Sequence, residues 1–284
     1  MIINEGLSSL IRMSNYLALH ASYVQGGGGN TSIKLNDGRM LIKASGLSLS
    51  KVSHDFGYAS VDFRKIREYL LNSNIDEDAF SSKVMRLNTI KTFRPSMETG
   101  FHAALGDCVL HSHSVYANVL NCSVEGVSII KRLFPNACFI EYVAPGLSLS
   151  AEINTNRKNN IFFLQNHGII VSSSTAEDVI ELHEYLNAKI ISELNLPTLN
   201  NKSHPDSDTV TMTERVLFPD QVIYMNPKSK FLGSTAQNEI INAHAYIHEQ
   251  ISKLGLTVKY LNKTDVAFLT EMGAEKYRSQ VDVG

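Results

Sequence analysis

Hydrophobic residues recur every three to four positions in several segments, which is the pattern of helices with one buried face. This period predicts an N-terminal helix that reaches about His20 and a long amphipathic helix over 175–194. Shorter helices are predicted over 62–72 and 115–121, whereas the pattern over 76–88 is ambiguous. Much of the chain is therefore expected to be helical.

Strand patterns lie between these helices. Alternating apolar and polar residues predict a β-hairpin from 31–35 and 39–44, joined by Asn36-Asp37-Gly38. This tripeptide favours a tight turn because Asp and Gly tolerate positive φ. Apolar runs predict further short strands over 139–143 and 161–165. Helices and strands thus follow one another along the chain.

The C-terminal third has a different pattern. From 195 to 213 the chain is polar and contains two prolines, which predicts a linker or an exposed loop. A small α/β segment is predicted after it, with strands over 221–225 and 257–261 and helices over 237–253 and 264–280. We therefore expect a domain at 1–195, a linker at 196–213 and an extension at 214–284 that packs on the same domain.

Composition narrows the class of protein. A hydrophobic content of 43% can fill a core, and a net charge of −2 provides no field for nucleic acid or an anionic membrane. No basic leader precedes an apolar core and no long uncharged apolar run occurs, so a cytoplasmic protein is expected. Cys108, Cys122 and Cys138 form no Cys-x-x-Cys motif, and we expect small buried hydrophobic side chains.

Three histidines and one glutamate supply the donor set of a catalytic metal ion. His111 and His113 are two residues apart in a strand-like segment, so their side chains point to the same face. His167 follows an apolar run and precedes a glycine, which places it at a strand end. Three imidazoles fill most of a tetrahedral shell around Zn²⁺ and leave a position for Glu98, water or substrate.

Other histidines compete for this role. His102 lies four residues after Glu98 on a predicted helix, so the two share a helical face and His102 is the main alternative ligand. His244 and His248 are also four residues apart, but no glutamate lies between them. We interpret that second pair as solvated surface.

Five short motifs follow one another in a fixed order: Gly29-Asn-Thr-Ser32, Lys43-Ala-Ser-Gly46, Pro95-Ser-Met-Glu98, His111-Ser-His113 and Asn166-His167-Gly168. Together they resemble the class II aldolase/adducin superfamily over most of residues 1–195. The resemblance implies a three-layer α/β/α fold with a central, mainly antiparallel sheet. It also implies a divalent metal ion, usually zinc, and a homotetramer with active sites near the subunit contacts.

The resemblance also places a substrate phosphate beside Gly29, Asn30, Ser45, Gly46 and Ser96. Backbone N–H groups of the glycine run 26–29 can surround an anion, and Lys43 can add a positive charge. Many family members carry a second hydroxyl just before the glutamate, where this chain has Met97. Methionine cannot donate that hydrogen bond. Either Lys43 or Arg94 compensates, or the anionic group lies elsewhere, or the substrate lacks a phosphate.

The C-terminal segment carries its own resemblance. Leu217-Phe-Pro-Asp220 and Ala274-Glu-Lys-Tyr-Arg278, with the glycine run, resemble longer members related to rhamnulose-phosphate aldolases. Some of these are fused to a short-chain dehydrogenase, and we expect the aldolase part alone here. Some family aldolases bring a tyrosine from a neighbouring subunit to protonate the leaving aldehyde. No tyrosine lies in the matching stretch 123–133, and Tyr116 and Tyr142 are the nearby candidates.

The leading hypothesis is a metal-dependent aldolase that converts a ketose 1-phosphate to dihydroxyacetone phosphate and an aldehyde, with Glu98 as the proton carrier. A pentulose-phosphate 4-epimerase that uses the same bond cleavage is an alternative, as is a dehydratase or decarboxylase. A metal-free, adducin-like scaffold is a further alternative, but a scaffold does not need three imidazoles and the acid.

Overall fold

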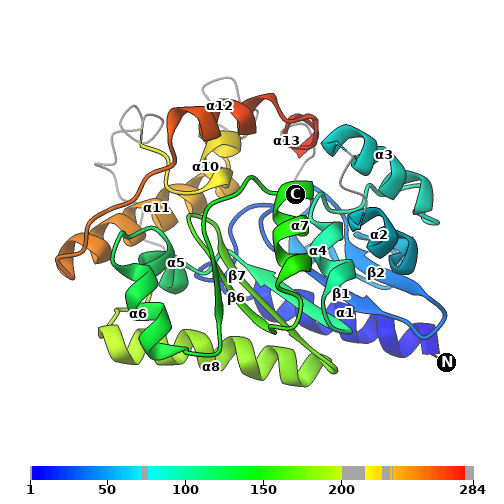
Figure 1. The fold of residues 1–284 in the computed structure, drawn as a ribbon, viewed down its shortest axis with the longest axis horizontal. Helices are drawn as coiled ribbons and strands as arrows, with labels where there is room; N and C mark the ends of the chain where they lie inside the picture. The colour runs from blue at the N-terminus through cyan, green and yellow to red at the C-terminus, as the bar shows by residue number, and fades with distance from the viewer. Residues whose placement is uncertain (1, 72–75, 200–214, 226–230, 232, 279–284) are drawn as a thin grey trace.

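One seven-stranded sheet forms the centre of the molecule in a computed structural model that describes residues 2–71, 76–199, 215–225, 231 and 233–278 (Figure 1). The strand order is β3-β2-β1-β4-β7-β6-β5, and every neighbouring pair is antiparallel except the parallel pair β5 and β6. The strands are β1 (Asn30–Lys34), β2 (Arg39–Lys43), β3 (Tyr58–Asp62), β4 (Cys108–Ser112), β5 (Cys138–Ile140), β6 (Ile161–Leu164) and β7 (Gly168–Ser173). The predicted α/β fold with a mainly antiparallel sheet is confirmed.

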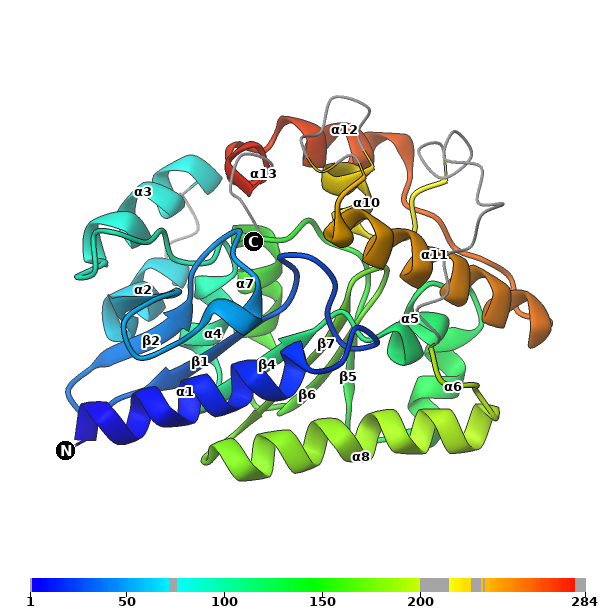
Figure 2. The same ribbon diagram turned by 180° about the vertical axis from the view of Figure 1, so that it is seen from behind.

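Helices cover both faces of this sheet. The helices α1 (Ile2–Ala18) and α8 (Ala176–Leu194) lie side by side on one face, as Figure 2 shows. The opposite face is covered by α2 (Phe63–Leu70), α4 (Thr99–Ala104) and α7 (Leu147–Thr155), with α3 (Glu77–Leu87) near the sheet edge (Figure 1). This gives the three layers that the family resemblance implies, and α3 shows that the ambiguous segment 76–88 is helical.

The predicted hairpin is confirmed, since β1 and β2 pair antiparallel with Ile33 opposite Leu41. Its turn needs a glycine because Gly38 has φ +92°, a conformation that side chains with a Cβ rarely adopt. The 3₁₀ helix η1 (Leu49–Lys51) follows β2. The hairpin brings the residues just before β1 and just after β2 to the same end of the sheet.

Successive side chains of β4 lie on opposite faces of the sheet. Val109 packs in the core beneath α4 and α7, and His111 lies on the same face with its ring against Phe101. Leu110 belongs to the opposite core, and Ser112 on that side bonds to a residue of α8. The sheet face that carries His111 is therefore the face of the candidate site.

The described residues of the C-terminal segment form helices joined by turns and loops and no strand, and this corrects the α/β extension expected from the sequence. The helices are α10 (Pro219–Tyr224), α11 (Thr235–Lys253), α12 (Lys263–Glu271) and α13 (Gly273–Arg278). Of these, α11 packs against α5 (Val115–Asn121), which is followed by α6 (Gly126–Leu133). None of these helices in the described parts of the chain is long and apolar enough to span a bilayer.

The predicted strand 221–225 is wrong because Pro219 opens a helix there, and the side chain of Gln221 accepts hydrogen bonds from the backbone N–H groups of Leu217 and Phe218. The predicted strand 257–261 makes only an isolated bridge from Val258 to Ser123. A short apolar run does not distinguish a strand from a turn of buried helix. The expected linker falls largely on 200–214, outside the described residues, and stays a prediction.

A buried polar network joins α8 to β4 and α1. His183 is fully buried, and its ring nitrogens bond to the hydroxyls of Ser112 (2.7 Å) and Tyr16 (2.9 Å). Burial lowers the pKa of His183 to about 3, so the imidazole is neutral in the folded protein at neutral pH. The unfolded chain takes up a proton below the ordinary pKa of 6.5, whereas the folded chain does so only near its own much lower pKa.

Folding stability should therefore fall as the pH decreases from about 6.5, and His183 should contribute to that loss. Between pH 6 and pH 5 the slope of the unfolding free energy should be smaller in His183→Gln than in wild type by about 1.2 kcal/mol per pH unit. Urea denaturation of the metal-free protein at several pH values measures both slopes. His54→Gln, at an exposed site, is the matched control, and equal slopes for wild type and His183→Gln would contradict the assignment.

Candidate metal centre and substrate pocket

Three buried imidazoles converge at one end of the sheet. His111 comes from β4, His113 directly follows that strand, and His167 lies in the turn between β6 and β7. The Nε2 atoms of His111 and His113 are 3.1 Å apart, and one nitrogen from each of the three rings lies within 4.8 Å of the others. The structure thus brings together the three histidines that the sequence predicts as ligands.

The turn that carries His167 depends on two unusual neighbours. Asn166 has φ 54°, and its side-chain amide donates to the backbone carbonyls of Leu217 and Lys259, at 2.8 Å each. A Cβ at Gly168 would lie 2.1 Å from the carbonyl oxygen of Ser112, so only glycine lets β7 start this close to β4. These contacts hold His167 opposite the other two histidines.

Hydrogen bonds determine which ring nitrogens carry protons. The Nδ1 atom of His111 is 2.9 Å from the carbonyl oxygen of Ile169, and Nδ1 of His113 is 2.7 Å from a carboxylate oxygen of Asp220. Both oxygens accept, so each Nδ1 donates and each Nε2 presents a lone pair. Two lone pairs at 3.1 Å repel unless a positive charge lies between them. Around a tetrahedral Zn²⁺ with Zn–N of about 2.0–2.1 Å, ligand nitrogens are about 3.3 Å apart.

Glu98 faces the same point. Its carboxylate oxygens lie 3.5 Å from Nε2 of His111 and 3.5 Å from Nε2 of His167. The amide of Asn30 donates to Oε2 at 2.7 Å, whereas buried Oε1 has no hydrogen-bond partner among the described residues. A buried oxygen without a partner is costly unless a cation binds it.

Charge in this cluster favours a cation. Burial lowers the pKa of His111 to about 4 and that of His167 to about 3, so both are neutral at neutral pH. Burial alone would raise the pKa of Glu98, but positive charge on His111 or His167 and the hydrogen bond from the amide of Asn30 lower it, which favours the ionised carboxylate. Neutral imidazoles with an ionised carboxylate are a donor set that fits a divalent ion.

His102 is not part of this cluster, although the sequence made it the main alternative ligand. Its Nε2 bonds to the side-chain oxygen of Asn30, and its Nδ1 lies 2.7 Å from the hydroxyl of Ser32. An amide oxygen only accepts, so Nε2 donates and Ser32 donates in turn to Nδ1. This hydrogen bond orients Asn30 so that its NH₂ group points at Glu98. His102 therefore holds the residue that holds the carboxylate.

The expectation of a solvated pair at His244 and His248 is wrong for the first residue. His244 is buried, and burial lowers its pKa to about 4, because α11 packs against α5. His248 is half-buried and its Nε2 lies 3.0 Å from the hydroxyl of Tyr260. The helix buries a wider face than its polar sequence indicated.

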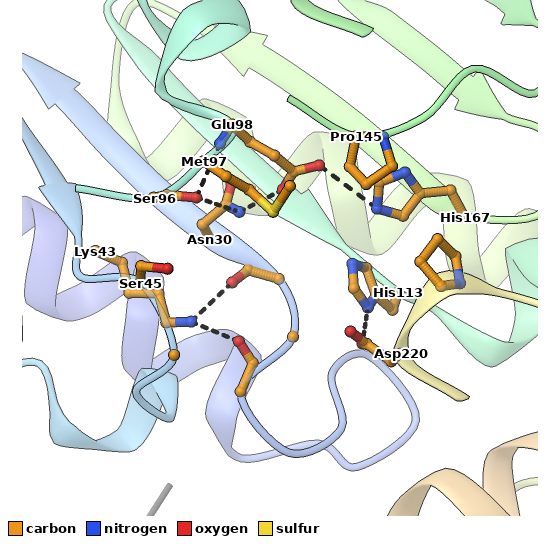
Figure 3. A pocket seen from close by; sticks show the side chains of 15 residues that line it. Asn30, Lys43, Ser45, Ser96, Met97, Glu98, His113, Pro145, His167 and Asp220 are labelled. Carbon is orange, nitrogen blue, oxygen red and sulfur yellow. Dashed lines mark hydrogen bonds and ion pairs between the residues drawn. The ribbon is translucent and has the colours of Figure 1, made fainter. Parts of the chain in front are cut away.

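A pocket of about 390 Å³ opens beside the histidines (Figure 3). It contains every residue predicted to hold the phosphate: Gly29, Asn30, Lys43, Ser45, Gly46 and Ser96. Met97, Glu98, His113, His167 and Asp220 line it as well. Within the described part of the chain, Tyr116 and Tyr142 do not line this pocket. Protonation of the aldehyde by a tyrosine from a neighbouring subunit stays a prediction.

Three N–H groups of the glycine run bond within the protein. The backbone N–H of Gly26 donates to Glu239 and that of Gly27 to the hydroxyl of Tyr224, at 2.7 Å each. The N–H of Gly28 donates to the carbonyl of Gln25. These three N–H groups are therefore occupied by protein acceptors. Gly29, the residue of the run that is predicted to hold the phosphate, lines the pocket, and its role stays a prediction.

Lys43 contributes to the same loop. Its ammonium donates to the carbonyls of Gly27 (2.7 Å) and Gly29 (3.2 Å), as Figure 3 shows. Arg94 instead bonds to Ser81 and lies over the ring of Tyr277, beside a neighbouring pocket. Of the two cations predicted to compensate for Met97, only Lys43 lines the site pocket.

The sequence did not assign a role to the site residues from the C-terminal segment. Asp220, Tyr224 and Glu239 contact His113 and the glycine run, yet they lie 107 to 213 residues away from their partners along the chain. The available signal for Asp220 was its place in the motif Leu217-Phe-Pro-Asp220, which marks a resemblance but names no partner. No spacing rule connects residues so distant.

The chain belongs to the class II aldolase and adducin family, since residues 8–190 match the class II aldolase and adducin N-terminal domain. A Bacillus subtilis (strain 168) protein named uncharacterized oxidoreductase YuxG is 28% identical over 210 residues, which are 66% of this chain and 30% of that protein. This chain thus spans under a third of the length of that relative.

In two further comparisons, the match covers most of the length of the compared protein. The 3-oxo-tetronate 4-phosphate decarboxylase of Haemophilus influenzae (strain ATCC 51907 / DSM 11121 / KW20 / Rd) is 28% identical over 181 residues, covering 58% of this chain and 75% of that enzyme. The solved N-terminal class II aldolase domain of a conserved Thermoplasma acidophilum protein aligns with a TM-score of 0.60 at 20% identity. It covers 66% of this chain and 93% of that one, and supports the fold.

His102 provides a test of the hydrogen-bond chain behind Glu98. Replacing it by Leu leaves the side-chain oxygen of Asn30 and the hydroxyl of Ser32 without their buried partner. We expect His102→Leu to lower the unfolding free energy by about 2–4 kcal/mol, measured by urea denaturation. His248→Leu, at a half-buried site with one side-chain partner, should cost less than about 1.5 kcal/mol. Equal losses in both variants would contradict this role.

Proposed function

We propose that the protein is a metal-dependent class II aldolase that cleaves or forms a carbon–carbon bond in a sugar phosphate. The proposed reaction converts a ketose 1-phosphate to dihydroxyacetone phosphate and an aldehyde. The observation that carries the proposal is the buried carboxylate of Glu98, which faces His111 and His167 at 3.5 Å each inside the pocket of the predicted phosphate residues. Family membership supports the same class of chemistry.

His111, His113, His167 and Glu98 would hold a divalent ion, and the nitrogen-rich set favours Zn²⁺. When bound there, such an ion supplies positive charge that stabilises the negative charge left on the substrate oxygens as the bond breaks. The fit rests on the unpartnered Oε1 of Glu98 and on the facing lone pairs of His111 and His113.

Glu98 is the proposed proton carrier. In the synthetic direction the ionised carboxylate takes a proton from the donor carbon of dihydroxyacetone phosphate, and in cleavage the protonated acid returns it. The low pKa of Glu98 keeps it in the base form at neutral pH before substrate enters. The bond from Asn30 holds Oε2, so Oε1 is the oxygen available to the reacting atoms.

The remaining pocket residues would hold the anionic end of the substrate. The hydroxyls of Ser45 and Ser96 are donors, and Lys43 supplies positive charge beside them. Asn30 lines the same pocket, but its NH₂ group already bonds to Ser96 and Glu98. Met97 occupies the position of the missing hydroxyl and gives the pocket an apolar patch. The proposed substrate is thus a phosphorylated sugar. The part of the pocket around Met97 is less polar than the family pattern implies.

A decarboxylase is the second candidate. Its support is the Haemophilus influenzae relative, named as a 3-oxo-tetronate 4-phosphate decarboxylase. Loss of CO₂ next to a carbonyl leaves the same kind of oxygen-stabilised carbanion as aldol cleavage, so the same donor set and proton carrier suit both reactions. The 4-epimerase is a third outcome, and the adducin-like scaffold does not account for an intact set of ligands.

The homotetramer, the cytoplasmic location and the division of the chain at 195 and 213 also remain predictions.

Products distinguish these candidates. Ketose 1-phosphates, pentulose phosphates and 3-oxo acid phosphates are incubated with zinc-loaded protein and followed by NMR. We expect dihydroxyacetone phosphate and a free aldehyde from a ketose 1-phosphate. An intact sugar inverted at C4 would identify the epimerase, and release of CO₂ would identify the decarboxylase. Protein that acquires no divalent ion would support the scaffold.

Glu98→Gln tests the proton carrier, because glutamine keeps the shape of the side chain but cannot carry the proton. Exchange of the donor-carbon hydrogen of dihydroxyacetone phosphate with D₂O should fall by about 10²–10⁴-fold while bound zinc is retained. Proton NMR measures the exchange and elemental analysis measures the zinc. Glu77→Gln is the matched control, since Glu77 is a partly buried carboxylate that accepts from Leu147 outside this pocket. Full exchange in Glu98→Gln would overturn the assignment.

A further inference from the structure

A carboxylate from the C-terminal segment reaches the candidate metal centre. Asp220 is fully buried, and its Oδ2 lies 2.7 Å from Nδ1 of His113, as the dashed line in Figure 3 shows. The residues that match the family end at 190, so Asp220 lies outside them. The structure therefore contains a contact to the site that the matched domain does not account for.

The position of Asp220 is set by contacts other than His113. The carbonyl of Leu217 accepts a 2.8 Å hydrogen bond from Asn166, the residue directly before His167. The side chain of Gln221 caps the backbone N–H of Leu217 at 2.6 Å, and Asp220 follows in the first turn of α10. The start of α10 is thus attached to the turn that carries another proposed ligand, which places the carboxylate against His113.

The glycine run covers this pair. A Cβ on Gly28 would lie 2.6 Å from Oδ2 of Asp220 and 2.7 Å from Nδ1 of His113, so the backbone packs directly on the hydrogen bond. Tyr224 and Glu239, also from the C-terminal segment, bind the N–H groups of Gly27 and Gly26. The glycine run therefore covers one side of the pair, where the backbone leaves no room for a side chain at position 28.

We propose that Asp220 is the positioning residue of His113, and that the C-terminal segment is thereby a component of the metal centre. Its carboxylate accepts a hydrogen bond from Nδ1–H of His113. This bond selects the tautomer whose Nε2 lone pair points toward His111 and His167. It also orients the ring and makes the nitrogen a stronger donor to a divalent ion. This inference rests on the proposed metal dependence but not on the identity of the substrate.

The test measures binding of Zn²⁺ alone, without turnover. A chromophoric chelator competes with wild type, Asp220→Asn and the control Glu77→Gln, and all three are first checked for equal thermal melting. Asparagine has the size of aspartate but no charge, so Zn²⁺ affinity should fall by about 10–100-fold. Glu77→Gln removes the charge of a partly buried carboxylate that accepts from Leu147 outside this pocket, and its affinity should stay within about 3-fold of wild type.

A double-mutant cycle separates positioning from a general loss of structure. In a His113→Ala background, Asp220 has no ring to orient, so Asp220→Asn should change the Zn²⁺ affinity by less than about 3-fold. The visible absorption of bound Co²⁺ should shift in Asp220→Asn and not in Glu77→Gln. An equal loss of affinity in both backgrounds would show that Asp220 acts through the fold and would overturn the proposal.

One further test uses wild-type protein, so its result does not depend on whether the variants fold. Nitrogen NMR of metal-free wild type should show His113 protonated at Nδ1 at neutral pH, whereas a ring protonated at Nε2 would overturn the proposal. Failure of the two ideas is also distinguishable. If wild type binds Zn²⁺ and Asp220→Asn binds it equally well, the proposal for Asp220 fails and the aldolase proposal stands. If wild type binds neither Zn²⁺ nor another divalent ion, the proposed function itself fails.

Discussion

The mutual approach of three imidazoles and one carboxylate in a buried site is the constraint around which this end of the protein is organised. Lone pairs of His111 and His113 face each other at 3.1 Å, and Glu98 directs an unpartnered oxygen at the same point. In a low-dielectric interior this arrangement is unfavourable by itself and favourable around a divalent cation. The fold must hold these groups together before any ion binds.

It does so through buried hydrogen bonds to several of the site residues. Ser32 and His102 orient Asn30, and Asn30 in turn holds Glu98. Carbonyl and carboxylate oxygens set the tautomers of His111 and His113. Such buried bonds are stronger than in water, and an unmade one is costly, so the site is rigid before substrate enters. Rigid, preorganised groups are what stabilisation of developing charge requires.

The C-terminal segment contributes to this order. It binds two N–H groups of the glycine run, receives two hydrogen bonds from Asn166 and places Asp220 beside His113. Position 28 needs a glycine for close packing, because a Cβ there would overlap the His113–Asp220 pair. The same loop is tied to the sheet by Lys43.

The sequence by itself determined the features that local periodicity encodes. The hairpin around Gly38, the helices α1 and α8, and the shared direction of His111 and His113 follow from side-chain alternation and turn chemistry within a few residues. Only the tertiary structure decided that residues 221–225 are helical, that His244 is buried, that His102 serves Asn30, and that Asp220 meets His113 across 107 residues. These outcomes depend on which surfaces pack together, and the free energy of packing between distant segments leaves no periodic trace in either segment alone.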